Sequence, residues 1–268
     1  MTRLTTRLIL LLAAALGIGC QTAGDTTRAE SVSELRVVTS GGFATAYRML
    51  APEFEARTGI RLVTEYGAST GGAPNSIPVR LERGEQFDVV ILSRPALDGL
   101  TERGDVIAES RTDLVRSLIG MAVRKGAPVP DISTPEAFIA ALYAAESIGY
   151  SASVSGTYLA TDLWPRLGIW QDLEPKSRRI VSERVADVVA RGDVEIGFQQ
   201  VSEILPTEGI IFVGPIPAAH QKVTTFSTGI TTRSRNADAA RRLIEFLASV
   251  EVAHTVAETG LSPVALEY

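Results

Sequence analysis

Short apolar runs alternate with stretches of helical periodicity along the first third of the chain. Residues 35–39 form the first run, and residues 43–54 then carry apolar side chains at i, i+4, i+7 and i+11, on one face of a helix. Residues 60–66 and 88–93 are further runs, and the second is almost wholly apolar, as in a strand of a parallel sheet that is buried on both faces. The pattern predicts a βαβαβ unit and therefore an α/β fold.

The middle of the chain predicts a second group of strands and helices. Residues 117–123 are apolar and end at a stretch rich in Gly and Pro, 125–130, where we expect the chain to cross into a second lobe. The extended, Thr-rich residues 222–230 predict a return strand, and residues 236–250 predict a closing amphipathic helix. Between the two crossings we expect helices and short strands, among them residues 133–145, 147–150, 194–198 and 209–213.

These elements together predict a protein of two α/β lobes, each a sheet flanked by helices, joined by two crossing strands. Lobe 1 takes residues 34–120 and 226–268, and lobe 2 takes residues 121–225. A chain of 268 residues that is 45% hydrophobic can bury cores of this size. Ligands of α/β proteins bind beyond the carboxyl ends of the strands, so that edge is where we expect a site.

Residues 1–20 have the pattern of a secretory signal peptide. Arg3 and Arg7 precede residues 8–18, which carry no charge, and small residues follow. The apolar run is too short to span a bilayer, so it indicates export rather than a membrane-spanning helix. We therefore expect the mature protein to be periplasmic or otherwise extracytoplasmic.

Cys20 is the only cysteine, which excludes an internal disulfide. It follows Gly19 directly and resembles the lipid acceptor of a bacterial lipoprotein, although Gly17 stands where that motif usually has Leu. Lipidation of Cys20 would anchor the protein to a membrane, with the polar residues 21–33 as a flexible tether. The alternative is a small buried cysteine or one that is removed with the leader.

Acidic residues outnumber basic ones, 31 to 26, and the formal net charge is −5. This balance argues against a surface for nucleic acid. It also means that an anionic ligand would have to be held by local dipoles and hydrogen bonds rather than by the field of the whole protein.

Hydroxyl side chains and glycines follow three of the predicted strands. Where a helix begins after such a strand, its first backbone N–H groups lack partners and carry partial positive charge, which favours an anion. Gln199 follows another strand and could also face the cleft between the lobes. The candidate ligand-binding residues at the three strand ends are Ser40 with Gly41, Ser69 with Thr70, and Ser155 with Gly156.

Catalysis has little support in the sequence. The two histidines, His220 and His254, lie late in the chain and neither has metal-ligand spacing with other ligating residues. The Gly-rich residues 67–72 lack the Lys of a phosphate-binding loop. We therefore predict no enzymatic activity, no cofactor and no metal. A secreted serine hydrolase would need one of the histidines beside Ser40, Ser69 or Ser155.

Several segments resemble the molybdate-binding type of periplasmic solute-binding protein of ABC importers, a type II periplasmic binding protein. The resemblance covers about residues 35–263. It implies two α/β lobes that close on a tetrahedral oxyanion held by hydroxyls and backbone amides. It rests on Thr-Ser-Gly-Gly-Phe at 39–43, the helix end at 51–59, Tyr-Gly-Ala-Ser-Thr-Gly at 66–71, Phe-Asp-Val-Val-Ile-Leu-Ser at 87–93, and the stretch 248–263.

The resemblance also implies roles for particular residues. Ser40 and Ser69 match serines of the first lobe, whereas Ser155 and Val185 match residues that donate backbone amides from the second lobe. Phe198 stands where the family has a tyrosine whose hydroxyl contacts the ligand. Unless Gln199 replaces that hydroxyl, one ligand oxygen lacks a partner, so the ligand need not be molybdate.

The sequence therefore predicts a monomeric binding component of an ABC importer, with a membrane permease as its partner. Its ligand would be a small oxyanion, molybdate or tungstate first. A small organic carboxylate is the alternative if Arg94 or Gln199 lines the cleft. A secreted hydrolase, or a sensor or adhesion module that serves no transporter, are the other possibilities.

Overall fold

The computed structural model describes residues 34–181 and 183–266. The predicted signal peptide, the tether and the lipidation site at Cys20 lie outside these residues. Among the helices it does describe, none combines the length and the apolar character needed to cross a membrane.

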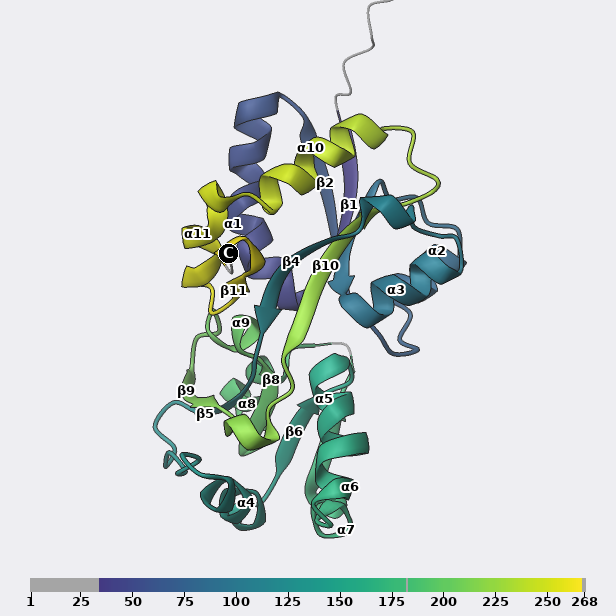
Figure 1. The fold of residues 1–268 in the computed structure, drawn as a ribbon. Coiled ribbons are helices and arrows are strands. Elements are labelled where there is room, and N and C mark those ends of the chain that lie inside the picture. Colours follow the sequence, from purple (N-terminus) through teal and green to yellow (C-terminus); the bar gives the residue numbers. More distant parts are fainter. Residues whose placement is uncertain (1–33, 182, 267–268) are drawn as a thin grey trace, which may run out of the picture. The chain divides into compact units, whose positions relative to one another are not determined.

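A mixed six-stranded sheet contains both the beginning and the end of the described chain (Figure 1). Its first three strands in sequence pair in parallel, and the later strand β10 runs antiparallel to its two neighbours, β3 and β4. Across the sheet the strands are β11 (Ser262–Pro263), β4 (Thr112–Ser117), β10 (Thr224–Ile230), β3 (Val89–Ser93), β1 (Glu34–Ser40) and β2 (Arg61–Gly67).

A mixed five-stranded sheet is built from the middle of the chain. Here β6 pairs in parallel with both β7 and β8, while β5 runs antiparallel to β8 and β9. Across the sheet the strands are β7 (Ser177–Ile180), β6 (Ile148–Ser151), β8 (Ile196–Gln200), β5 (Ile119–Arg124) and β9 (Ile210–Pro215).

Helices pack on both faces of each sheet (Figure 1). Those of the first sheet are α1 (Gly41–Thr58), α2 (Ile77–Glu82), α3 (Arg94–Glu102), α10 (Ala237–Leu247) and α11 (Ala253–Glu258). Those of the middle segment are α4 (Pro135–Ala144), α5 (Val154–Tyr158), the π-helical turn η2 (Leu159–Leu163), α6 (Trp164–Arg166), α7 (Trp170–Leu173), α8 (Val185–Arg191) and α9 (Val201–Ile204). Short 3₁₀ turns lie at Ala108–Ser110, Glu174–Lys176, Ala218–His220, Val250–Val252 and Val264–Leu266.

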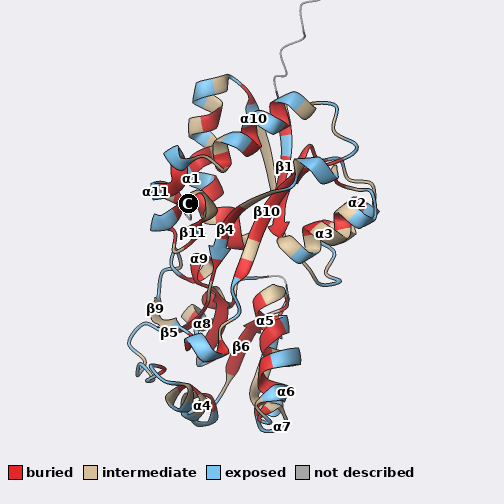
Figure 2. Ribbon diagram, viewed as in Figure 1, coloured by how far each residue is buried: buried red, intermediate tan, exposed pale blue. Residues whose placement is uncertain are grey.

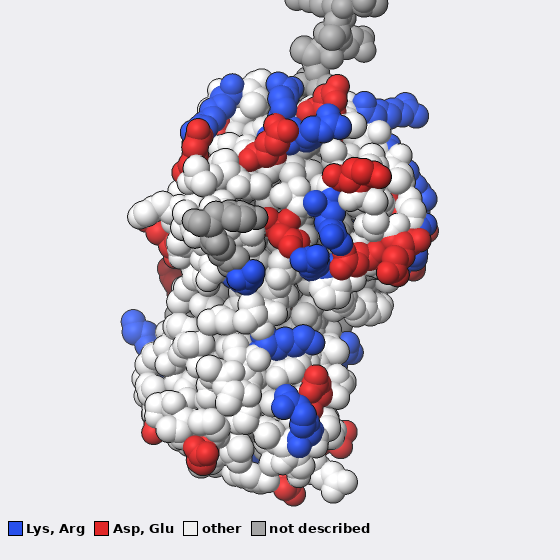
Figure 3. All heavy atoms as spheres, in the orientation of Figure 1, with Lys and Arg blue, Asp and Glu red and all other residues white. Residues whose placement is uncertain are grey.

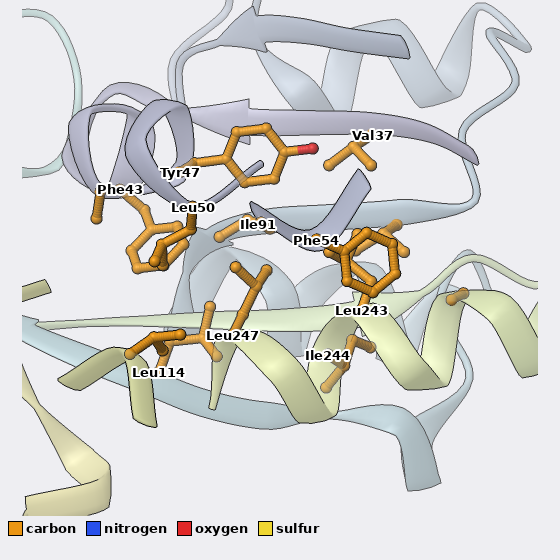
Figure 4. Close-up of a cluster of buried hydrophobic side chains, with 14 of the residues drawn as sticks. Val37, Phe43, Tyr47, Leu50, Phe54, Ile91, Leu114, Leu243, Ile244 and Leu247 are labelled. Carbon is orange, nitrogen blue, oxygen red and sulfur yellow. The ribbon is translucent and has the colours of Figure 1, made fainter. Parts of the chain in front are cut away.

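The first sheet separates two hydrophobic cores because successive residues of a strand face opposite sides. Val37 and Ile91 face α1 and α10, as Figure 4 shows, whereas Val38 and Val90 face α2 and α3. The helical face predicted for residues 43–54 is the face of α1 buried in this core. The helix ends at Gly59, whose φ of 70° lies in the left-handed region that glycine adopts without strain.

The second sheet has an aromatic core of its own, and its inner strands β5, β6 and β8 are largely buried, as Figure 2 shows for β6. Phe198 lies at the centre of this core. Its ring meets Phe138 edge to face, with the ring centroids 6.0 Å apart, and Trp164 at 6.1 Å. Because β8 alternates, Phe198 faces the core and Gln199 faces the opposite side of the strand.

These observations confirm the predicted α/β fold of two sheets flanked by helices. One detail differs, because the apolar run at 117–123 is not one strand: β4 ends at Ser117 in the first sheet and β5 begins at Ile119 in the second. The loop 125–130 therefore follows a strand of the second sheet instead of leading into it. Ser117 and the first five residues of β5 are buried, so the run stays apolar where the chain changes sheet. The lobe boundaries at 120/121 and 225/226 stay a prediction.

Candidate functional site

A cavity of about 640 Å³ lies where strands of both sheets end and the helices that follow them begin. Six of the eight residues that the sequence predicts as ligand-binding line it: Ser40, Gly41, Ser69, Thr70, Ser155 and Gln199. The volume is within the range of sites for small organic molecules. Hydroxyl residues from three strand ends, together with Gly41 and Gln199, therefore line the same cavity.

The other two predicted residues, Gly156 and Val185, are not among the lining residues. A Cβ on Gly156 would overlap the carbonyl oxygen of Ser151, so this glycine allows α5 to pack closely on β6. The side chain of Val185 is buried in a cluster with Val189 and Val194. Both residues have a packing role in this structure, and their contacts with a ligand stay a prediction.

Ser40 is the last residue of β1 and immediately precedes α1. Its side chain makes no capping hydrogen bond, and among the described residues its buried Oγ has no hydrogen-bond partner. A buried hydroxyl without a partner costs free energy, so such groups usually meet a ligand or water. Ser40 and the first N–H groups of α1 are therefore available to an anion in the cavity.

Ser69 has a structural contact as well as a place in the cavity. Its Oγ accepts a hydrogen bond from the backbone N–H of Ser93 at 2.9 Å. The hydroxyl hydrogen of Ser69 is still available to donate to a ligand.

Replacing each serine by alanine distinguishes Ser40, whose hydroxyl has no partner among the described residues, from Ser69, whose hydroxyl also supports the fold. We expect Ser40→Ala to weaken ligand binding roughly tenfold, because a hydrogen bond to a charged group contributes about 1.5 kcal/mol or more, with little change in stability. Ser69→Ala should weaken binding similarly and also lower the free energy of unfolding by about 1–3 kcal/mol, because the N–H of Ser93 loses its acceptor. Calorimetry and urea unfolding measure the two effects; equal stabilities would contradict the distinction.

Three arginines that the sequence analysis did not single out also line the cavity: Arg48 of α1, Arg179 of β7 and Arg184 just before α8. Arg48 lies over the ring of Tyr66 at 4.9 Å, and Arg179 Nη2 donates to the carbonyl of Ala152 at 3.3 Å. Within the described part of the chain, none of the three forms an ion pair with a carboxylate. Their positive charges are therefore available to an anionic ligand.

Two acidic side chains, Glu183 and Glu203, line the same cavity. Glu183 forms an ion pair with Arg191 at 2.9 Å, which offsets its charge. Glu203, in α9, accepts a hydrogen bond from Gln199 Nε2 at 3.0 Å. Burial raises the pKa of Glu203 to about 7, although the charge of Arg184 and the hydrogen bond from Gln199 act in the opposite direction.

Glu203 lies beside the beginning of α1, where Gly41 makes room for it. A Cβ on Gly41 would overlap Glu203 Oε1, so any other residue at this position would displace the carboxyl group. Two hydrogen bonds hold α9 against α1: Ser202 Oγ donates to the carbonyl of Gly42 at 2.7 Å, and Thr45 Oγ1 donates to the carbonyl of Ser202 at 3.2 Å. The position of Glu203 is thus fixed by elements of both sheets.

Other residues that the sequence analysis considered lie away from the cavity. Arg94 forms an ion pair with Asp113 at 2.7 Å, and Phe198 is in the core, so a hydroxyl at that position would not reach a ligand. His220 is buried against Phe138, and His254 is exposed beside Glu258. Neither histidine lines the cavity. In the described ranges, no group of three or more His, Cys, Asp and Glu side chains could hold a metal ion.

A comparison with known proteins finds a relative that is an enzyme by name. The chain is 44% identical over 236 residues to the aconitate isomerase of a Pseudomonas species, which covers 88% of this chain and 90% of the relative. This overturns our sequence-based prediction that the protein is not an enzyme. That prediction looked for histidines and metal ligands, whereas the cavity offers a half-buried carboxylic acid, Glu203.

Solved structures of binding proteins share the fold. The periplasmic molybdate-binding protein of Azotobacter vinelandii is 19% identical, with a TM-score of 0.65, over 85% of this chain and 98% of that one. The sulfate-binding protein SubI of Mycobacterium tuberculosis H37Rv is 20% identical, with a TM-score of 0.67, over 88% of each chain. The resemblance to a periplasmic binding protein is thus confirmed for the fold, while the specificity for molybdate stays a prediction.

The family to which the chain belongs follows from a match over most of its length. Residues 35–262 match the family described as bacterial extracellular solute-binding protein. An extracytoplasmic location agrees with this description, while lipidation of Cys20 stays a prediction. The chain belongs to the bacterial extracellular solute-binding protein family.

Proposed function

We propose that the protein is an extracytoplasmic isomerase that interconverts the cis and trans forms of aconitate in the cavity between its two sheets. Aconitate is a small unsaturated acid with three carboxylates. The observation that carries the proposal is the presence of Arg48, Arg179 and Arg184 around one cavity. The activity in the name of the relative, 44% identical, supports the same substrate.

The charges of the cavity suit a ligand with several carboxylates. A guanidinium group matches a carboxylate with two parallel hydrogen bonds, and such charge-assisted bonds are stronger than neutral ones. The three arginines come from separate elements, so they can meet carboxylates at different ends of one molecule. Ser40 and the amino end of α1 add donors that are not yet used within the protein.

Binding of molybdate or a similar oxyanion, with delivery to an ABC permease, is the second candidate. The hydroxyl of Ser40 favours it, since it has no partner among the described residues and lies where the resemblance implies an oxyanion contact. One feature favours the carboxylate instead. Three arginines line the cavity, whereas the resemblance implies that hydroxyls and backbone amides alone hold an oxyanion.

The two candidates are distinguished by one set of measurements on the purified protein. We expect proton NMR to show that the protein converts cis-aconitate and trans-aconitate to the same equilibrium mixture. Calorimetry should show binding of aconitate and weaker or no binding of molybdate and sulfate. Tight binding of molybdate without any conversion of aconitate would overturn the proposal in favour of oxyanion transport.

A further inference from the structure

We propose that Glu203 is the catalytic acid–base residue of this isomerisation and that Gln199 and Gly41 hold its carboxyl group in position. The inference rests on the proposed function and adds the residue that performs the proton transfer. It begins from the acidic groups of the cavity, because an isomerisation that moves a double bond needs a group that takes up and returns a proton.

Of the two carboxyl groups that line the cavity, Glu203 is the one that can perform this proton transfer. Glu183 and Glu203 are the two acids among the lining residues. Glu183 is paired with Arg191, whereas Glu203 takes part in no ion pair within the described residues. Neither histidine of the chain lines the cavity, so no imidazole competes for the role.

The hydrogen bonds around Glu203 occupy one of its two oxygens. Gln199 Oε1 accepts the backbone N–H of Ala186 at 3.4 Å, which turns the amide NH₂ of Gln199 toward Glu203. That NH₂ donates to Glu203 Oε1, the atom that the missing Cβ of Gly41 accommodates. With Oε1 held in this way, Oε2 is the oxygen that can exchange a proton with a bound substrate.

The chemistry balances without any other reactant. The Glu203 carboxylate removes a proton from the methylene carbon of aconitate, and the electron pair of that C–H bond spreads over the adjacent double bond toward the far carbon. The carboxyl group then returns a proton to that far carbon, so that the double bond ends between the central carbon and the former methylene carbon. The orientation of the methylene arm at the first step decides whether the product is cis or trans.

The electrostatics of the cavity support both proton transfers, the removal from the methylene carbon and the return to the far carbon. With a pKa of about 7, Glu203 is present in both its charged and its protonated form near neutral pH, as a group that takes and returns a proton must be. Three arginines line the same cavity, and fixed positive groups of this kind stabilise the negative charge that develops on a substrate in the transition state.

The first test is Glu203→Gln, which keeps the size of the side chain and its hydrogen bond with Gln199. We expect kcat to fall about 100- to 10,000-fold while the Kd for cis-aconitate, measured by calorimetry, changes less than about threefold. The control is Glu208→Gln, an exposed position after α9, which should leave kcat unchanged. The retained affinity also shows that the variant is folded.

A second variant, Gln199→Met, tests the positioning role and does not depend on the folding of the first. The hydrogen bond from Gln199 lowers the pKa of Glu203, so its removal should shift the rise of kcat/KM with pH to higher pH. The charged groups that face Glu203 across the cavity, Arg48, Arg179, Arg184 and Glu183, are the same in both proteins.

The outcomes separate this inference from the function on which it rests. Wild-type protein that does not interconvert aconitate refutes the proposed function itself. If the wild type is active, Glu203→Gln activity within tenfold of wild type, or a loss of binding equal to the loss of activity, overturns the catalytic role of Glu203. An unchanged pH profile in Gln199→Met overturns the positioning role of Gln199.

Discussion

Replacing Arg179 and Arg184 together by glutamine should weaken the binding of aconitate about 100-fold or more. Each arginine lines the cavity, and within the described residues neither forms an ion pair with a carboxylate. A hydrogen bond between charged groups contributes about 1.5–3 kcal/mol, and each 1.4 kcal/mol corresponds to about tenfold in affinity. Calorimetry with cis-aconitate and with trans-aconitate measures the loss directly.

Arg178 offers a matched control on the same strand. Arg178 and Arg179 are both exposed residues of β7, but successive residues of a strand point to opposite faces, and only Arg179 lines the cavity. We expect Arg178→Gln to bind aconitate as the wild type does and Arg179→Gln alone to bind about tenfold more weakly. If both single variants lost affinity equally, the loss would reflect net charge rather than a contact.

The cavity combines positive side chains within a protein that is acidic overall. On the face shown in Figure 3, basic and acidic side chains are interspersed rather than gathered into a region of one sign. Because the formal net charge of the protein is −5, long-range attraction of anions by its overall field is small. The selectivity for a carboxylate would come from the contacts in the cavity, as the Arg178 control tests.

The part of the site that the sequence predicts is the part encoded by neighbouring residues. A strand, a hydroxyl, a glycine and a helix follow one another at Ser40 and Gly41, so their geometry is local and can be read from the pattern. Because parallel strands end at the same edge of a sheet, Ser69 falls beside Ser40 without further information. The α/β fold follows from the same periodicities.

The sequence does not predict the three arginines of the cavity because no local pattern links them. Arg48 is an exposed residue of a helix whose other face forms the core, and it looks like any solvated helix residue. Arg179 lies on an edge strand that the sequence analysis did not predict, and Arg184 lies before α8. Only the pairing of β6 with β7 brings Arg179 to the cavity.

The prediction of no catalysis failed for a related physical reason. Glu203 carries no motif, and its acid–base character comes from an environment that the fold creates. Gln199 donates a hydrogen bond to its carboxyl group, the missing Cβ of Gly41 makes room for it, and the packing of α9 on α1 positions it. A sequence pattern shows residue types and spacing, but it does not show which carboxyl group the fold will remove from solvent.

The burial of Glu203 should make the protein less stable as the pH rises. The folded-state pKa is raised from 4.5 to about 7, so between these values the folded protein binds more protons at this position than the unfolded chain. The contribution of the protonated group is complete below pH 4.5 and is lost as the pH rises to 7. The loss is at most about 3–4 kcal/mol, because each pKa unit corresponds to about 1.4 kcal/mol.

The glutamine in Glu203→Gln does not titrate, so this variant should not lose stability at that position as the pH rises. Relative to wild type, its free energy of unfolding should rise by up to about 3–4 kcal/mol between pH 4 and pH 8, as measured by urea unfolding without ligand. Glu208→Gln, which removes the same charge from an exposed position, corrects for the change in net charge. A difference that did not change with pH would show that Glu203 remains well solvated. The expected result would mean that the group needed for proton transfer lowers the stability of the protein at neutral pH, and natural substitution to glutamine would then be opposed by function rather than by folding.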